Sequence, residues 1–316
     1  MTQVNSSLED IYPKGKTIIR EVGLRDGLQL VKSFPTTEAK KAWIDIDYRA
    51  GLRHFEIGSY LPAKAFPQFQ DTESLIRKIS SLNDARSSAL VLNKRGAING
   101  LLGNADELTC VISASEEHNL RNAKRSRKDS LREISEIISL RADSDSKPLI
   151  SVGIAMAFGC SIQGKIDIKE VVNMAERSVH MGADLIGIAD TVGYGGPKQV
   201  KELISALRSA IGDTQLLMHF HNTRGLGLSN VAAALDMGVN VFDASLSGLG
   251  GCLFAPKATG NIVLEDVAFL CETMGFPTGI DINTLLPARK ILQEQMPEEI
   301  LYGALARAGL PNTDYE

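Results

Sequence analysis

The sequence predicts an α/β protein built as a closed (β/α)8 TIM barrel with extra helices at the C-terminus. Short apolar runs alternate with amphipathic stretches along the chain, and such alternation predicts parallel strands joined by crossover helices. The pattern repeats eight times, which is the number of units that closes a barrel. No linker-like or low-complexity stretch interrupts it. We therefore expect residues 1–316 to form one catalytic domain, with the barrel over about 17–275.

The expected strands are short apolar runs, and the expected helices are the longer amphipathic stretches between them. The strands lie near 17–22, 53–57, 88–92, 107–112, 149–156, 184–189, 215–219 and 240–244. The helices lie near 37–50, 71–81, 94–102, 119–141, 168–181, 197–210, 225–237 and 261–274. Gly51, Gly182 and Gly238 each precede a strand, where a helix often stops in the left-handed conformation.

Two further helices are expected after the barrel, near 281–293 and 297–308 within a C-terminal segment of about 280–308. They would pack outside the barrel or in the interface of a homo-oligomer. We expect such an oligomer, a dimer or higher.

The composition excludes several classes of protein. The chain is 44% hydrophobic and 23% charged, with a net charge of −4 and a pI near 5.8, and this balance argues against a nucleic-acid partner. No apolar run is long enough to span a membrane. The polar, acidic N-terminus resembles neither a signal nor a transit peptide. Four widely spaced cysteines fit reduced thiols in the cytoplasm.

One basic run, RNAKRSRK at 121–128, departs from the acidic balance. Charged runs of this kind usually form a solvated helix face. The alternative is a contact for an anionic ligand such as a nucleotide phosphate.

Polar side chains gather where the expected strands end. Active sites of such barrels form at the carboxyl ends of the strands, and burying many charges there is costly unless they are paired or bind a metal. The residues in question lie in or after the first, second, sixth, seventh and eighth strands: Arg25, Asp26, Glu56, Asp190, Thr191, His219, His221, Asp243, Ser245, Cys252 and Asn261.

The pair His219 and His221 is the most informative of these features. Residues two apart in a strand face the same side, so both imidazoles would meet near the strand's end and could hold a divalent cation. A single histidine is more often structural. We assign His54, two residues before Glu56, to the opposite end of the barrel.

The neighbouring residues offer the remaining chemistry. Asp26 supplies oxygen ligands, which suit Mg²⁺ or Mn²⁺, although an aspartate alone could cap a helix. Arg25 would stabilise an anion or serve only as an ion-pair partner. Glu56 would orient Arg25 or the waters of a metal. Cys252 and Asn261 turn the glycine-rich stretch at 248–251 from a plain turn into a candidate catalytic loop.

The motifs that carry this chemistry are G-x-R-D-G-L-Q at 23–29, E-x-x-S at 56–59, G-C-x-x-x-G-K-I at 159–166, D-T-x-G at 190–193, H-x-H at 219–221 and G-L-G-G-C-x-x-A-x-x-A-x-G-N at 248–261. Together they make the chain resemble the 3-hydroxy-3-methylglutaryl-CoA lyase family of metal-dependent barrels, from about Ile18 to about Gly279. The roles that this resemblance implies are metal ligation by Asp26, His219, His221 and Asn261, catalysis by Arg25 and Cys252, support by Glu56 and Asp190, and substrate contact by Gln29 and Lys32.

The implied reaction is cleavage of a carbon–carbon bond in an acyl-CoA substrate that bears a tertiary 3-hydroxyl group. The products are acetyl-CoA and a keto acid, which is acetoacetate for the type substrate. The implied cofactor is Mg²⁺ or Mn²⁺. His219 or Asp26 would remove the hydroxyl proton, Arg25 would stabilise the thioester enolate, and Cys252 could protonate the carbanion.

Two departures from the family pattern leave the acyl group open. Leu253 and Phe254 follow the cysteine, where proline and an aromatic residue are typical. Arg224 stands in Asn-Thr-Arg, where Asp-Thr-Tyr is typical, and would pair with a substrate carboxylate or a neighbouring acid.

These departures define the alternatives. They are a lyase for citramalyl-CoA or for a longer 3-hydroxy-3-alkylglutaryl-CoA and, less favoured, an isopropylmalate- or homocitrate-type synthase, which has no cysteine in this loop. A non-enzymatic scaffold is disfavoured because the full ligand set is present.

Overall fold

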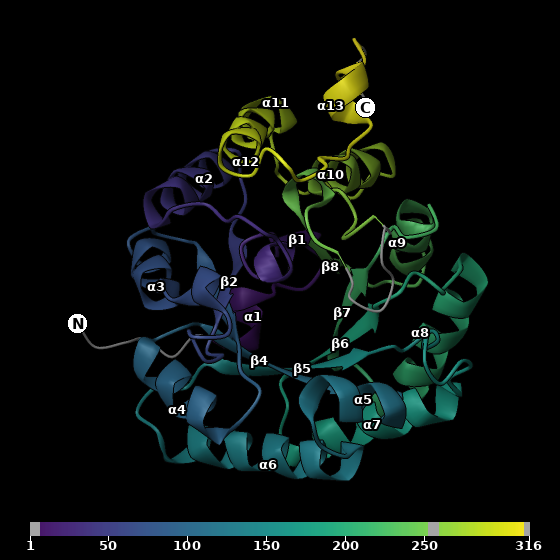
Figure 1. Cartoon of the computed structure of the whole chain (residues 1–316). Helices are drawn as coiled ribbons and strands as arrows, with labels where there is room; N and C mark the ends of the chain where they lie inside the picture. Colours follow the sequence, from purple (N-terminus) through teal and green to yellow (C-terminus); the bar gives the residue numbers. More distant parts are fainter. Residues whose placement is uncertain (1–6, 252–258, 313–316) are drawn as a thin grey trace.

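The computed structural model describes residues 7–251 and 259–312, and in it eight strands form a closed parallel barrel. Each strand pairs in parallel with the next, and β8 pairs with β1 to close the ring. Figure 1 shows the helices surrounding these strands. The strands are β1 (Ile18–Glu21), β2 (His54–Ser59), β3 (Arg86–Leu90), β4 (Glu107–Ser113), β5 (Leu149–Ala155), β6 (Leu185–Asp190), β7 (Gln215–Phe220) and β8 (Val241–Ala244). The predicted fold is therefore confirmed.

The outer helices begin and end at the signals that their sequences carry. Asn93 and Ser115 accept backbone N–H groups as N-caps, Pro197 begins α8, and Gly182 ends α7 at a φ of 102°. The helices around the barrel are α2 (Thr37–Arg49), α3 (Thr72–Ser80), α4 (Lys94–Gly103), α5 (Glu116–Ala123), α6 (Arg127–Asp143), α7 (Ile168–Met181), α8 (Pro197–Ile211), α9 (Gly227–Leu235) and α10 (Leu264–Thr273).

Several helices differ from their predicted extents. The single helix expected over 119–141 is two helices, α5 and α6, because Lys124 adopts a left-handed conformation at a φ of 56° and Ser126 caps a new start. The last barrel helix begins at Leu264 and not at 261. The residues before it are extended, because the Ile262 N–H donates to the Phe220 carbonyl at the end of β7.

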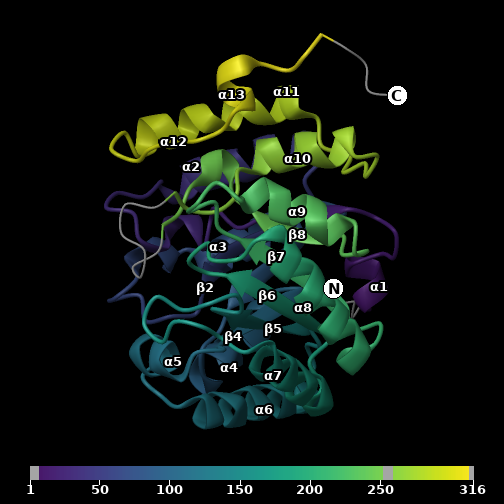
Figure 2. The ribbon, with the colours of Figure 1, turned by 90° about the vertical axis from the view of Figure 1, so that its right-hand side faces the viewer.

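The C-terminal helices are shorter than predicted. In place of 281–293 the chain forms α11 (Ile282–Leu285), a 3-10 turn η4 (Leu286–Ala288) and α12 (Arg289–Gln295), and α13 (Leu305–Ala308) is the only helix within 297–308. Pro287 lies at the junction of α11 and α12, where it lacks the N–H that a continuous helix would use. These elements stack over α2 and α10 on the outside of the barrel, as expected (Figure 2).

A short helix that the sequence analysis did not predict, α1 (Leu8–Ile11), closes the N-terminal end of the barrel. Ser7 and Asp10 form a capping box for it. Its Ile11 packs with Leu185 and Leu217 inside the barrel floor. His54 contacts the Ile11 carbonyl at 2.7 Å and stacks on Tyr12, so His54 lies at this end, as predicted.

Within the described ranges, no helix has the length and apolar character needed to cross a membrane.

Candidate active site

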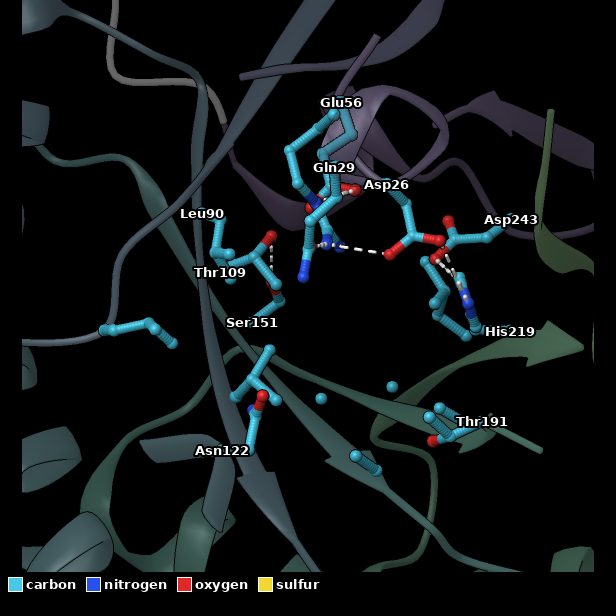
Figure 3. Close-up of a pocket in the computed structure, with 18 of the residues that line it drawn as sticks. Asp26, Gln29, Glu56, Leu90, Thr109, Asn122, Ser151, Thr191, His219 and Asp243 are labelled. Carbon is cyan, nitrogen blue, oxygen red and sulfur yellow. Dashed lines mark hydrogen bonds and ion pairs between the residues drawn. The ribbon is translucent and has the colours of Figure 1, made fainter. Parts of the chain in front are cut away.

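A cavity of about 340 Å³ enters the barrel from the carboxyl ends of the strands. Apart from His118 on α5, its titratable lining comes from the neighbouring strands β7, β8, β1 and β2 and the segments that follow β1 and β7. Figure 3 shows Asp26, His219 and Asp243 on one side of this cavity and Thr109 and Ser151 across from them. Most of the charged residues that the sequence placed at strand ends therefore share one pocket.

The two histidines face the same side at the end of β7, as the period of a strand requires. Their Nε2 atoms lie 3.0 Å apart. His219 Nδ1 lies 3.0 Å from Asp243 Oδ2, and β7 and β8 are in register at these two residues. Since a neutral imidazole donates from one nitrogen and accepts at the other, this contact assigns the proton to Nδ1 and leaves Nε2 free to act as a ligand.

Asp26 reaches the histidines from the turn after β1. Its Oδ2 lies 4.0 Å from His219 Nε2 and 3.8 Å from His221 Nε2. The turn is held by the Asp26 and Gly27 N–H groups, which both donate to the Val22 carbonyl. Three potential ligand atoms, from a carboxylate and two imidazoles, thus lie within 4.8 Å of one another.

Asn261 completes the cluster from the far side of the glycine-rich loop. Its Nδ2 donates to Asp26 Oδ2 at 2.9 Å and to the Leu249 carbonyl at 3.2 Å. The segment that carries Asn261 can lie this close to the glycine-rich loop only because residue 260 is glycine. A Cβ at Gly260 would lie 1.5 Å from the Gly250 carbonyl oxygen. Asn261 also forms a bridge with His221, which fixes its backbone next to the ligand pair.

The residues fit a divalent cation. Asn261 Oδ1 is buried and lacks a hydrogen-bond partner within the described part of the chain, a costly arrangement that calls for an explanation. Because Asn261 Nδ2 now faces Asp26 Oδ2, a half-turn of the amide would place Oδ1 beside Asp26, where it could be a ligand. Two nitrogens bound at right angles to one cation, each at about 2.1 Å, lie roughly 3 Å apart, which matches the spacing of the two Nε2 atoms.

The charges of this cluster depend on one another. Burial opposes ionisation of Asp26, but Arg25 and the two histidines outweigh it and hold the pKa of Asp26 well below its ordinary value. Burial also lowers the pKa of His219, yet the contact with Asp243 and the charge of Asp26 raise it overall. For His221, burial and the neighbouring His219 lower the pKa to about 4. His221 is therefore neutral near pH 7, as a metal ligand must be.

Arg25 is held rigidly above the cluster. Its Nε lies 2.8 Å from Glu56 Oε2, and its Nη1 lies 2.8 Å from Asp26 Oδ1 and 3.1 Å from Gln29 Oε1. Glu56 is buried, which raises its pKa, while Arg25 acts in the opposite direction. The structure thus gives Glu56 the place beside Arg25 that the sequence analysis expected, and Gln29 lines the same pocket.

Two other predicted residues lie outside this cluster. Asp190 accepts hydrogen bonds from the N–H groups of Tyr194 and Gly195, at 2.8 and 2.9 Å, and so holds the turn after β6. The Lys32 side chain is 84% exposed, and its Nζ lies 3.8 Å from Glu298 Oε2. Lys32 does not line the cavity. Cys252, Leu253 and Phe254 fall outside the described residues.

The remaining basic groups bind mainly within the protein. Arg224 donates to the carbonyls of Val192 and Gly193 and lies over the Tyr194 ring. Its charge also acts to lower the pKa of the neighbouring acid Asp190, and a contact with a substrate carboxylate stays a prediction. Within the basic run, Arg125 pairs with Glu133, and Arg127 pairs with Glu116 and Glu170. These ion pairs account for the two arginines, while Arg121, Lys124 and Lys128 are exposed, as expected of a solvated surface.

Asp243, which the sequence placed among the polar residues at the strand ends without a role, is a positioning residue. Besides His219, it contacts buried Arg20, whose Nε lies 2.7 Å from Asp243 Oδ1 and whose Nη1 lies 2.8 Å from Glu107 Oε1. The signal was present, because a single acid inside the apolar run VFDA faces the barrel interior in register with His219. Only the register, however, shows which histidine it meets.

Fold and site together define a TIM-barrel enzyme with a candidate divalent-metal site formed by one carboxylate and two imidazoles. The profile of the HMGL-like family matches residues 16–292. The chain belongs to this family, and it is an enzyme of the hydroxymethylglutaryl-CoA lyase type.

Individual relatives agree with this assignment. The chain is 36% identical over 287 residues to the hydroxymethylglutaryl-CoA lyase YngG of Bacillus subtilis, with 90% of this chain and 94% of that protein covered. It is 35% identical over 281 residues to the (R)-citramalyl-CoA lyase of Chloroflexus aurantiacus, covering 85% and 88%. An HMG-CoA lyase structure from Acinetobacter baumannii, in complex with coenzyme A and 3-methylmalate, superposes with a TM-score of 0.87 at 37% identity, covering 98% and 99%.

Proposed function

We propose that this enzyme cleaves a 3-hydroxy-3-methylglutaryl-CoA-like ester to acetyl-CoA and a keto acid, with Mg²⁺ or Mn²⁺ as cofactor. The observation that carries the proposal is the convergence of Asp26, His219, His221 and Asn261 beside Arg25 in one pocket. The similarity to lyases over most of the chain supports the reaction class.

The four ligands would hold the cation, which when bound lowers the pKa of the substrate's hydroxyl group. Because Asp243 fixes the proton of His219 on Nδ1, the side chain presents Nε2 to the pocket. That nitrogen would hold the cation, so its lone pair would not be available to the substrate. Of the two candidates we therefore favour Asp26, whose carboxylate keeps further lone pairs, as the acceptor of the hydroxyl proton. Asp243 orients His219 and does not touch the substrate.

Loss of that proton lets the bond between C2 and C3 break, and negative charge develops on the thioester oxygen. Arg25 is placed to stabilise this charge, because Glu56, Asp26 and Gln29 fix its guanidinium in advance. Proton donation to the carbanion is assigned to Cys252 by family resemblance. Homo-oligomer formation and a cytoplasmic location stay predictions.

A second candidate is cleavage of citramalyl-CoA, which the similarity to the Chloroflexus aurantiacus enzyme favours. The two esters differ at C3, where citramalyl-CoA carries its carboxylate directly. The same ligands and the same arginine would serve either reaction.

Turnover of purified protein with Mg²⁺ tests both candidates. Release of acetyl-CoA from 3-hydroxy-3-methylglutaryl-CoA supports the first, and release from citramalyl-CoA alone supports the second. No release from any 3-hydroxyacyl-CoA ester, from protein that binds Mn²⁺ and is folded by circular dichroism, would refute the proposed function.

A further inference from the structure

The cavity wall farthest from Arg25 and Asp26 is built from very small residues. In a ring of eight strands β5 and β6 lie opposite β1 and β2, and they line the cavity with Gly153, Gly187 and Ala189. Gly153 and Gly187 are direct partners in the register of β5 and β6. Barrel interiors are usually filled by bulky branched side chains, so this pair of glycines leaves a gap where other barrels have packing.

Neither glycine is required by the fold. A Cβ on Gly153 would meet the Cys110 carbonyl oxygen and Val111 Cγ2 at 3.7 Å, and a Cβ on Gly187 would meet Gly153 Cα at 3.4 Å and Leu217 Cδ2 at 3.5 Å. These are ordinary contact distances. By comparison, a Cβ on Gly58 would lie 2.3 Å from Thr72 Oγ1, so that glycine is needed for packing.

Glycine in the middle of a strand weakens it and often marks a close approach by a ligand. Since the protein itself would accept alanine at both Gly153 and Gly187, the space they leave is best explained by a group that is not part of the protein.

The chemistry of this wall favours a hydrocarbon. Val111 and Leu217 border the gap with apolar surface. At its floor, the Ser151 hydroxyl donates to Glu107 at 2.6 Å and lies 3.0 Å from the Thr109 hydroxyl, so both hydroxyls are engaged within the protein; they appear together in Figure 3. Arg20 is paired with Glu107 and Asp243. Among the described residues of this wall, no cationic side chain without an ion-pair partner is available to bind a second carboxylate of the substrate.

We infer that the substrate carries at C3 a hydrocarbon group longer than methyl, and that this group occupies the space beside Gly153 and Gly187. The inference rests on the proposed function and specifies its substrate class. In the proposed reaction the hydroxyl, carboxylate and thioester arms of the tertiary carbon would face the metal ligands and Arg25, which leaves the fourth substituent to point at the small-residue wall.

The reaction is otherwise unchanged. The C2–C3 bond breaks, the hydroxyl proton passes to the base, and C3 becomes the ketone carbon that keeps the hydrocarbon group. C2 takes up one proton and leaves as acetyl-CoA. No oxidant, reductant or further reactant is required.

The test compares 3-hydroxy-3-methylglutaryl-CoA with 3-hydroxy-3-butylglutaryl-CoA in the intact enzyme with Mg²⁺. A buried methylene contributes roughly a factor of four, so three more methylenes predict a kcat/KM for the butyl ester higher by up to about 60-fold. Gly153→Val fills the gap and is expected to lower kcat/KM for the butyl ester at least about tenfold while sparing the methyl ester.

Gly187→Ala provides a second variant with a smaller change in volume, should valine at 153 impair folding, and its expected loss for the butyl ester is about three- to tenfold. Gly196→Ala is the matched control, because a Cβ there has only Leu226 Cδ1 at 4.0 Å as a neighbour and lies outside the cavity. It should leave the ratio of the two esters unchanged.

The outcomes separate this inference from the proposed function. Preference for the butyl ester that falls in Gly153→Val or Gly187→Ala supports the inference. Efficient cleavage of the methyl ester with a poorer butyl ester, or an equal loss of both esters in the variants, overturns the inference and leaves the lyase function standing. Cleavage of neither ester overturns both.

Discussion

Replacing Asp243 by asparagine should weaken metal binding without removing a ligand. Asp243 lies 3.0 Å from His219 Nδ1 through one oxygen and 2.7 Å from Arg20 Nε through the other. Asparagine has a single oxygen acceptor, so either the imidazole or the guanidinium loses its partner. Loss of such an orienting group typically costs about 10–100-fold in metal affinity, and we expect a loss in this range for Mn²⁺.

The same substitution also affects stability, so a control is needed. Removing one partner of a buried ion pair costs about 3–5 kcal/mol, and we expect the lower end because Glu107 still neutralises Arg20. Glu107→Gln is the matched control, since it removes the other carboxylate from Arg20 and leaves His219 untouched. Both variants should lose a similar unfolding free energy in urea, whereas only Asp243→Asn should weaken Mn²⁺ binding.

Isothermal titration with Mn²⁺ at neutral pH measures the affinity of both variants and of the wild type. Equal affinities for Asp243→Asn and the wild type would refute the orienting role. Equal losses in both variants would mean that general loosening of the barrel interior, and not the orientation of His219, sets the affinity.

Three further predictions concern the arginine, the thiol and a structural histidine. Arg25→Met should lower kcat by about 10²–10³-fold with little change in CoA affinity; a loss of affinity alone would contradict the enolate role. Cys252→Ser should reduce turnover about 10²-fold or more and leave Mn²⁺ binding intact, and an unchanged rate would exclude the thiol from the mechanism. Burial lowers the pKa of His54 to about 4. As the pH falls, this histidine therefore becomes protonated in the unfolded chain before it does so in the folded protein. The unfolding free energy should decline between pH 6.5 and 4 by on the order of 2–3 kcal/mol. His54→Gln keeps a donor for the Ile11 carbonyl and should flatten this decline in urea titrations, and an unchanged slope would assign it to other groups.

The barrel and the histidine pair could be predicted because they follow from short-range periodicity. Alternating apolar runs specify parallel strands, and a two-residue spacing places His219 and His221 on one face whatever surrounds them. The carboxyl ends of all strands then meet, which is why Asp26 could be expected near residues about 190 positions further along the chain.

Other features depend on contacts that a linear pattern does not contain. The break between α5 and α6 arises at Lys124, a residue that rarely adopts a positive φ. The partner of Asp243 depends on strand register, and the need for glycine at 260 appears only when Gly250 lies against it.

Titration with Mn²⁺ followed by electron paramagnetic resonance shows whether Asp26, His219, His221 and Asn261 bind one divalent cation. We expect one bound Mn²⁺ per wild-type chain, none in folded His221→Ala, and loss of turnover after chelation that returns when Mg²⁺ or Mn²⁺ is added. Full turnover in chelator-treated protein, or Mn²⁺ bound equally well by His221→Ala, would contradict a metal site formed by these four residues.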